Sequence, residues 1–116
     1  MLSYKVIFHI DEMTPWKLLL GNVRNLLNGF IEETIDVIVL ANSQAVHGYL
    51  NQETNDTYII EMKELSSNGV SFVACNNSLK ANQINNEDLL EFVKIVPSGV
   101  VFLVKKQSEG YAYIKP

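Results

Sequence analysis

The sequence predicts an α/β protein: one domain spanning residues 1–116, built in three layers around a mainly parallel five-stranded sheet with helices on both faces. Short β-rich runs alternate with helical stretches along the chain, which is the pattern of parallel βαβ units. Residues 35–41 are nearly all apolar, as expected for a central strand that is covered on both faces. A length of 116 residues fits one compact domain.

The first part of the chain predicts two strands with a helix between them. Residues 4–10 fit the first strand and residues 35–41 the second. Thr14 and Pro15 predict the helix start, with Thr14 as the N-cap and Pro15 at the first helical position, where no backbone N–H is needed. Apolar residues then recur at spacings of three and four, which places one stripe against the sheet: Trp16, Leu19, Leu20, Val23, Leu26, Leu27 and Phe30.

The second part of the chain continues the alternation. We expect a polar loop after residue 41, a helix over residues 58–67, a third strand over residues 70–74 and a short helix starting at Asn86. Gly69 stands where a helix end favours a left-handed residue. Residues 94–96 fit a fourth strand and residues 111–114 a fifth.

Residues 100–104 are five consecutive apolar residues, which suit a strand or a buried helix equally well. We favour a helix, because Ser98 can cap its start and Gly110 can stop it. Lys105 and Lys106 would then complement the helix dipole at its end.

Composition disfavours several classes of function. Nine basic residues against thirteen acidic ones give a net charge of −4, and no basic cluster predicts nucleic-acid binding. No apolar run approaches the roughly 20 residues of a membrane-spanning helix, and the start of the chain shows no signal-peptide pattern. The single cysteine cannot form an intramolecular disulfide, so we expect a cytoplasmic protein.

No motif predicts a metal or an organic cofactor. One cysteine and two separated histidines lack the spacing of zinc ligands. The chain has no P-loop and no G-x-G-x-x-G pattern. We therefore expect neither a metal site nor a cofactor.

Polar residues follow the ends of the predicted strands. In open parallel sheets, ligands bind outside the carboxyl ends of the strands, so these residues are the candidate site if the strands are neighbours. The candidates are His9, Asn42, Ser43, His47, Cys75, Asn76, Asn77 and Ser78.

Cys75 is the most distinctive candidate. It follows the apolar run of residues 70–74 and precedes a polar turn that we expect to open a helix. Backbone N–H groups at a helix start stabilise a thiolate and lower the thiol pKa. The amides of Asn77 and Ser78 offer hydrogen bonds to a bound anion or persulfide. The alternative is a structural cysteine that packs as a small hydrophobe. His9 and His47 are weaker candidates, since each is either a proton donor or acceptor near Cys75 or a structural residue.

Residues 72–80 (Phe-Val-Ala-Cys-Asn-Asn-Ser-Leu-Lys) resemble the cysteine motif of the DsrE-like family, the group of DsrE-, DsrF-, YchN- and Tus-type proteins. Residues 6–12, 21–27 and 107–116 agree with the small stand-alone branch of that family. The resemblance implies a parallel-sheet domain that assembles into homotrimers or hexamers. It also implies, from the sulfur-relay members, a cysteine that accepts and passes on sulfur as a persulfide. In this chain that role falls on Cys75.

Two functions remain open at this point. The first is a sulfur carrier or sulfurtransferase-like protein that holds a persulfide on Cys75 and works between a sulfur donor and an acceptor protein. The second is a non-catalytic oligomeric binding module in which Cys75 lines a small-ligand pocket between subunits.

Overall fold

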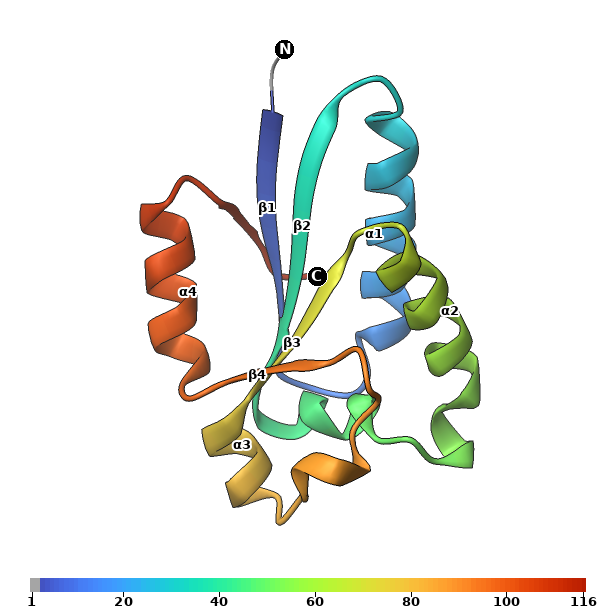
Figure 1. The fold of residues 1–116 in the computed structure, drawn as a ribbon, viewed down its shortest axis with the longest axis vertical. Helices are drawn as coiled ribbons and strands as arrows, with labels where there is room; N and C mark the ends of the chain where they lie inside the picture. Colours follow the sequence, from blue (N-terminus) through green and yellow to red (C-terminus); the bar gives the residue numbers. More distant parts are fainter. Residues whose placement is uncertain (1–2) are drawn as a thin grey trace.

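A five-stranded sheet, parallel throughout, forms the centre of the protein in a computed structural model that describes residues 3–116. The strands stand in the order β4-β3-β2-β1-β5 (Figure 1). Their bounds are β1 Ser3–Ile10, β2 Thr34–Ala41, β3 Ser71–Cys75, β4 Lys94–Val96 and β5 Ala112–Ile114. The predicted fold class is confirmed.

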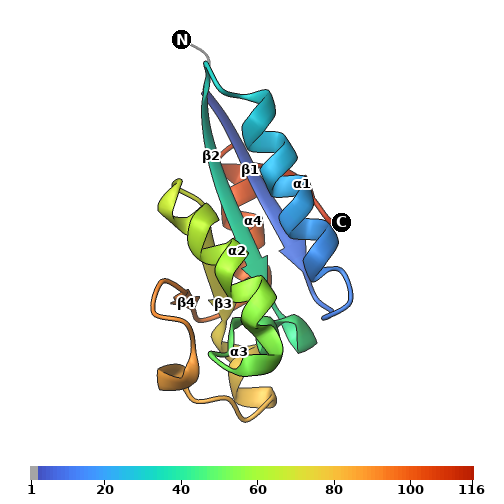
Figure 2. The same cartoon turned by 90° about the vertical axis from the view of Figure 1, so that its right-hand side faces the viewer.

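Helices cover both faces of this sheet. Helices α1 (Trp16–Gly29) and α2 (Asp56–Ser67) lie on one face and α4 (Gly99–Ser108) on the other, as Figures 1 and 2 show from two directions. Helix α3 (Asn76–Ala81) follows β3 directly. Among residues 3–116, no helix is long and apolar enough to cross a membrane.

The sheet separates two apolar clusters because strand side chains alternate between its faces. Phe8 and Val39 belong to the larger cluster under α1 and α2. Ile7 and Leu40, one residue away in each strand, belong to the smaller cluster under α4. Burial on both faces explains the continuous apolar run that predicted β2.

Helix α1 carries the predicted apolar stripe toward the sheet. Trp16, Leu19, Leu20 and Val23 are fully buried, while the later members of the stripe are partly exposed. The predicted cap at Thr14 is wrong, because the helix begins at Trp16 with Pro15 as its N-cap. Thr14 and Pro15 instead lie inside a turn closed by the N–H of Trp16, which donates to the carbonyl of Met13 at 3.2 Å.

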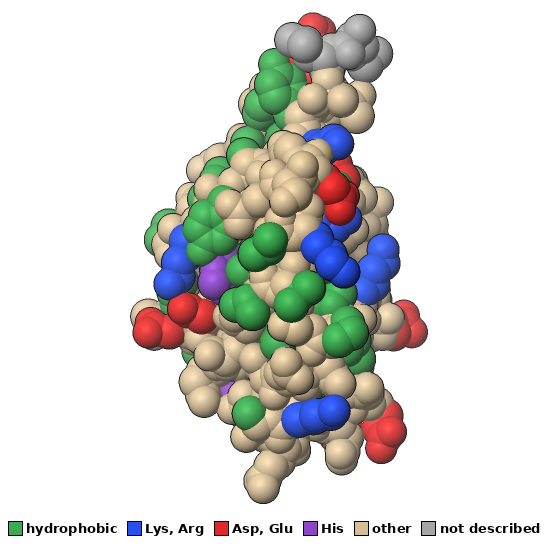
Figure 3. Space-filling model, turned by 90° about the vertical axis from the view of Figure 1, so that its left-hand side faces the viewer, with side chains coloured by type: hydrophobic (Ala, Val, Ile, Leu, Met, Phe, Trp, Pro, Cys, Tyr) green, Lys and Arg blue, Asp and Glu red, His purple; other side chains and the backbone are tan. Residues whose placement is uncertain are grey.

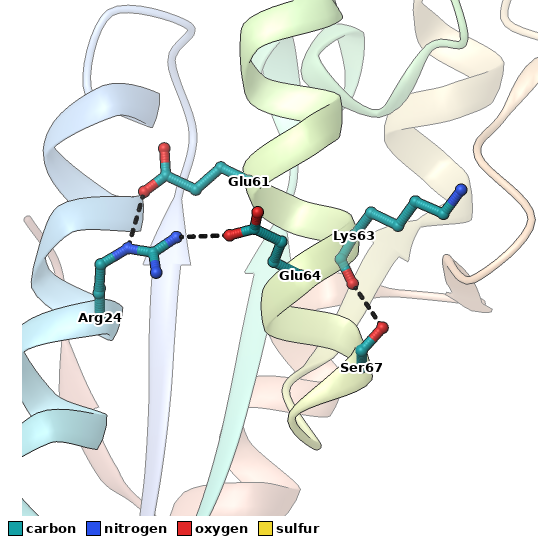
Figure 4. A network of polar contacts seen from close by, with 5 residues as sticks. All are labelled: Arg24, Glu61, Lys63, Glu64 and Ser67. Carbon is teal, nitrogen blue, oxygen red and sulfur yellow. Dashed lines mark hydrogen bonds and ion pairs between the residues drawn. The ribbon is translucent and has the colours of Figure 1, made fainter.

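One arginine links α1 to α2 on the protein surface. Arg24 pairs with Glu61 and Glu64, each at 3.4 Å (Figure 4). Exposed pairs of this kind contribute at most about 1 kcal/mol. The two helices are therefore held mainly by their apolar contacts with the sheet.

Two segments differ from the expectation. Residues 43–49, expected as a polar loop, form a 3-10 helix, Ser43–Tyr49, which buries Ala45, Val46 and Tyr49 completely. The helix expected from Asn86 is a single 3-10 turn, Asn86–Asp88, whose N-cap is Asn85. A further 3-10 turn, Glu53–Asn55, precedes α2.

The ambiguous run of residues 100–104 is helical, in α4, as predicted. Ser98 occupies the N-cap position, although its side chain makes no capping hydrogen bond. Gly69 and Gly110 both have the left-handed backbone expected of them, with φ of 98° and 97°.

Candidate functional site

The carboxyl ends of β1, β2 and β3 lie side by side, so the candidate residues at these ends meet. Strands β2 and β3 pair Leu40 with Val73 and Ala41 with Ala74. Asn42 and Cys75 are the next residues along the two strands, so they lie beside each other. The three strands are therefore neighbours, as the candidate site requires.

Cys75 is the last residue of β3 and the N-cap of α3. Its side chain faces α4, and the backbone N–H of Gly99 donates a hydrogen bond of 3.2 Å to Sγ. The approach is close: a Cβ added to Gly99 would lie 3.2 Å from Cys75 Cβ. This packing leaves Cys75 only 5% exposed in the single chain.

Ser78 stands in the first turn of α3, beside Cys75. Its Oγ accepts a hydrogen bond of 2.7 Å from the backbone N–H of Ser43, which leaves the hydroxyl hydrogen for the sulfur of Cys75. Ser43 has a φ of 49°, a left-handed conformation that is uncommon for a residue other than glycine. Such backbone strain is concentrated at functional sites.

Several hydrogen-bond donors act on the sulfur together. Burial raises the pKa of the Cys75 thiol. The Ser78 hydroxyl and the backbone N–H groups of Ser78, Gly99 and Asn77 oppose this effect, and the net result is a pKa below the ordinary value. A larger fraction of thiolate, the nucleophilic form, is therefore present near neutral pH.

His9 lies between two polar partners rather than against the cysteine. Its Nε2 is 2.9 Å from Asn42 Oδ1 and its Nδ1 is 2.6 Å from the Tyr113 hydroxyl. Tyr113, in β5, was not among the predicted site residues. No local signal marks it, because its place depends on the pairing of β5 with β1.

His47 contacts Asn82 rather than Cys75. Its Nε2 is 3.1 Å from Asn82 Oδ1, and the amide nitrogen of Asn82 donates to the carbonyl oxygens of Ser43 and Ser78 at 3.3 Å and 2.8 Å. Asn82 was also missed by the sequence analysis. It ties the turn at Ser43 to α3 and so supports the Ser43–Ser78 hydrogen bond.

The remaining candidates lie at the start of α3. Asn77 is exposed and acts on the sulfur through its backbone N–H, while Asn76 is half-buried as the first residue of the helix. Within the described part of the chain, no group of three His, Cys, Asp or Glu side chains is placed to hold a metal ion.

The fold and the site define a small parallel α/β protein with a hydrogen-bonded cysteine at the carboxyl end of a central strand. The profile of the DsrE/DsrF-like family matches residues 17–116. The chain belongs to this family, and the predicted resemblance is confirmed.

Two solved structures are similar over nearly the whole chain. The protein of unknown function MTH1491 from Methanobacterium thermoautotrophicum is 41% identical, with a TM-score of 0.88, and the match covers 97% of this chain and 99% of that one. The ychN protein from E. coli shares the fold, with a TM-score of 0.74 at 14% identity over 97% of this chain and 99% of its own. Among curated proteins, no sequence matches this chain.

Proposed function

We propose that this protein is a sulfur carrier that holds sulfur as a persulfide on Cys75 and passes it to an acceptor thiol. The observation that carries the proposal is the set of donors around Cys75, which lowers the thiol pKa although the side chain is buried. A structural cysteine needs no such donors, since it packs as a small hydrophobe. Membership of the DsrE/DsrF-like family, which includes sulfur-relay proteins, supports the same function.

The transfer requires no oxidant or reductant. The Cys75 thiolate attacks the outer sulfur of a donor persulfide, R–S–SH; a new S–S bond forms, the donor S–S bond breaks, and its electron pair leaves on R–S⁻. The proton is carried over on the transferred sulfur, which then releases it to water and becomes anionic. An acceptor thiolate then attacks this outer sulfur, and Cys75 leaves as a thiolate. A reducing compartment such as the cytoplasm keeps the free thiol available.

We also propose that copies of the chain assemble through the α4 face, as a trimer or hexamer. Hydrophobic side chains gather on this face (Figure 3). Val100, Val101 and Val104 of α4 are 62%, 50% and 64% exposed, and a groove of about 430 Å³ runs beside Val101 and Phe102. Exposed apolar patches of this kind mark protein–protein contacts. Since α4 begins at Gly99, a neighbour seated there would lie close to Cys75.

Sulfur loading is tested with intact mass spectrometry. The purified protein is incubated with a polysulfide donor and compared with Cys75→Ser, which keeps a similar shape but lacks the nucleophile. We expect one or more added sulfur atoms on the wild type alone, removed by a thiol reductant. The absence of an adduct under conditions that load a known carrier protein contradicts the proposal, and leaves the binding module as the better account.

Assembly is tested by light scattering coupled to size-exclusion chromatography. We expect a multiple of the 13.1 kDa chain for the wild type and a smaller species for Val104→Asp. Leu18→Asp is the matched control, because Leu18 is 58% exposed but lies on α1, on the opposite face. A monomeric wild type, or equal effects of the two substitutions, contradicts assembly through α4.

A further inference from the structure

Four polar side chains form a row across four adjacent strands, at the carboxyl end of the α4 face of the sheet. Ile7 and Val73 face α4, so His9 and Cys75, two residues further along β1 and β3, face the same way. Tyr113 of β5 pairs with Ile7 and shares its face. Asn42 lies two residues after Leu40, which also faces α4. The backbone at Asn42 is still extended, so its side chain faces the same way. In strand order the row is Tyr113, His9, Asn42 and Cys75.

Hydrogen bonds along this row orient the amide of Asn42. With Asn42 Oδ1 at 2.9 Å from His9 Nε2, this ring nitrogen carries the proton and donates it. The other ring nitrogen, Nδ1, is then an acceptor in the neutral imidazole, and the Tyr113 hydroxyl donates to it across 2.6 Å. With the amide of Asn42 turned this way, the neutral ring is the Nε2–H tautomer and the Tyr113 hydroxyl is the donor at Nδ1.

The amide nitrogen of Asn42 is left as a donor beside the cysteine. Among residues 3–116 this group donates to no protein acceptor. A Cβ added to Gly99 would lie 3.5 Å from Asn42 Cβ and 3.2 Å from Cys75 Cβ, so the two side chains share one side of Gly99. Neighbouring strands are only about 4.8 Å apart, which puts the amide within reach of a sulfur atom added to Sγ.

The position of the row agrees with the topology of the sheet. Strands β1 to β4 follow one another in one direction across the sheet, and β5 lies on the other side of β1. In open α/β sheets the crevice at such a reversal of strand order is where ligands bind. His9 and Tyr113 stand on the two strands at this reversal.

We propose that Asn42 binds the outer sulfur of the Cys75 persulfide through its amide N–H, and that His9 and Tyr113 are positioning residues that hold this amide in place. The inference rests on the proposed function. The donors from Gly99 and Ser78 act on the sulfur of Cys75 itself, whereas Asn42 supplies a donor for the sulfur that is carried. Stabilisation of the anionic outer sulfur keeps the persulfide loaded.

The test measures the persulfide fraction on Cys75 after loading with polysulfide, by intact mass spectrometry. Asn42→Asp has the same shape and still accepts from His9, but it has no N–H and carries a negative charge. We expect the loaded fraction relative to the free thiol to fall by about tenfold, the effect of one hydrogen bond to a charged group. For Tyr113→Phe we expect a smaller loss of about threefold, because the histidine is no longer held in one tautomer.

Tyr111→Phe is the matched control, because it removes a tyrosine hydroxyl whose partner is Asp36 rather than His9. We expect it to load as the wild type does. Nitrogen-15 spectra of the His9 ring give a second readout: the Nε2–H form in the wild type, and a mixture of tautomers in Tyr113→Phe. Circular dichroism confirms that each variant is folded.

The outcomes separate this inference from the proposed function. No persulfide on the wild type overturns both. A loaded wild type with equal loading of Asn42→Asp overturns the role of Asn42 alone, and an Nδ1–H tautomer in the wild type overturns the role of His9 and Tyr113. A loss in Tyr111→Phe as large as that in Tyr113→Phe shows a general effect of hydroxyl removal and also overturns it.

Discussion

The backbone N–H of Gly99 donates to Cys75 Sγ across 3.2 Å, and this bond joins the start of α4 to the end of β3. Cys75 is thus fixed by two segments, since α3 begins at the next residue and supplies further donors. The sulfur gains polar contacts that its own strand does not provide. The reactivity of the thiol therefore depends on the position of the start of α4, which carries the N–H of Gly99.

Ser78→Ala tests the contribution of the hydroxyl to the thiolate. The substitution removes a donor from Cys75 and should raise the thiol pKa toward its ordinary value, so less thiolate is present at neutral pH. We expect alkylation by iodoacetamide to slow by roughly threefold to tenfold, the effect of losing one hydrogen bond of ordinary strength. The measurement is the pH dependence of the labelling rate. Ser67→Ala is the control, because the Ser67 hydroxyl bonds within α2, to the carbonyl of Lys63; equal rates in all three proteins count against the role of Ser78.

Gly99→Ala tests the close packing over the cysteine. The added Cβ meets Cys75 Cβ at 3.2 Å, Leu40 Cδ2 at 3.4 Å and Asn42 Cβ at 3.5 Å, so Cys75 or the start of α4 must move slightly. We expect a loss of about 1–3 kcal/mol in the free energy of unfolding, measured with urea, together with slower alkylation of Cys75.

Gly21→Ala is the matched substitution for Gly99→Ala. Gly21 lies inside α1, and a Cβ there meets nothing within 4 Å. The same change should stabilise the protein by about 0.5–1 kcal/mol, because alanine favours the helix. The same sign at both glycines contradicts the packing assigned to Gly99.

Asn55→Ala tests a buried amide that holds the loop after β2. Asn55 is 3% exposed, and its Nδ2 donates to the carbonyl oxygens of His47 and Leu50 at 2.8 Å and 3.2 Å. Alanine leaves both carbonyls without this donor, so we expect a loss of about 2 kcal/mol in the free energy of unfolding. Asn25→Ala, at an exposed position of α1, should change it by less than about 0.5 kcal/mol. Similar losses at the two sites would show that the two hydrogen bonds of Asn55 contribute little to the free energy of unfolding.

Tyr111 makes the free energy of unfolding of the protein vary with pH in the alkaline range. Burial, the hydrogen bond to Asp36 and the negative charges of Asp36 and Glu109 raise the pKa of Tyr111 from 10.0 to about 12. The folded-state pKa is the higher one, so the protonated phenol contributes stability that is complete below pH 10 and is lost as the pH rises toward about 12.

We therefore expect the wild type to lose stability relative to Tyr111→Phe between pH 10 and about 12. Urea unfolding of both proteins across this range measures the difference. Burial also raises the pKa of Tyr49, but Tyr49 is present in both proteins and its effect cancels. A constant difference in the free energy of unfolding across the range contradicts the assignment to Tyr111.

The elements of the fold follow from local sequence, but the neighbours of each strand do not. Alternation of apolar runs and helical stripes predicted all five strands. The pattern of residues 111–114 indicated a strand without showing that it pairs with β1, and for this reason Tyr113 was missed. Ala45, Val46 and Tyr49 are all buried. Their spacing of three and four residues is typical of one face of a helix, so the segment expected to be a loop did contain a helical signal.

The site divides in the same way. The helix start after Cys75 and the donors of Asn77 and Ser78 were predictable, because they lie within three residues of the cysteine. The hydrogen bond from Gly99 and the burial of Cys75 were not, because α4 begins 24 residues later. The sequence analysis left His47 either as a proton donor or acceptor near Cys75 or as a structural residue; in the structure its Nε2 contacts Asn82.

The pairing of β5 with β1 joins residues about a hundred positions apart, as in the contact of His9 with Tyr113. Closing a loop of this length costs conformational entropy, which the contact must offset. Without β5, β1 would be an edge strand with a row of unpaired N–H and C=O groups. The three residues Ala112–Ile114 cover the middle of this edge, at Val6 to Phe8, and replace a long edge by a very short one, which offers another molecule little to pair with.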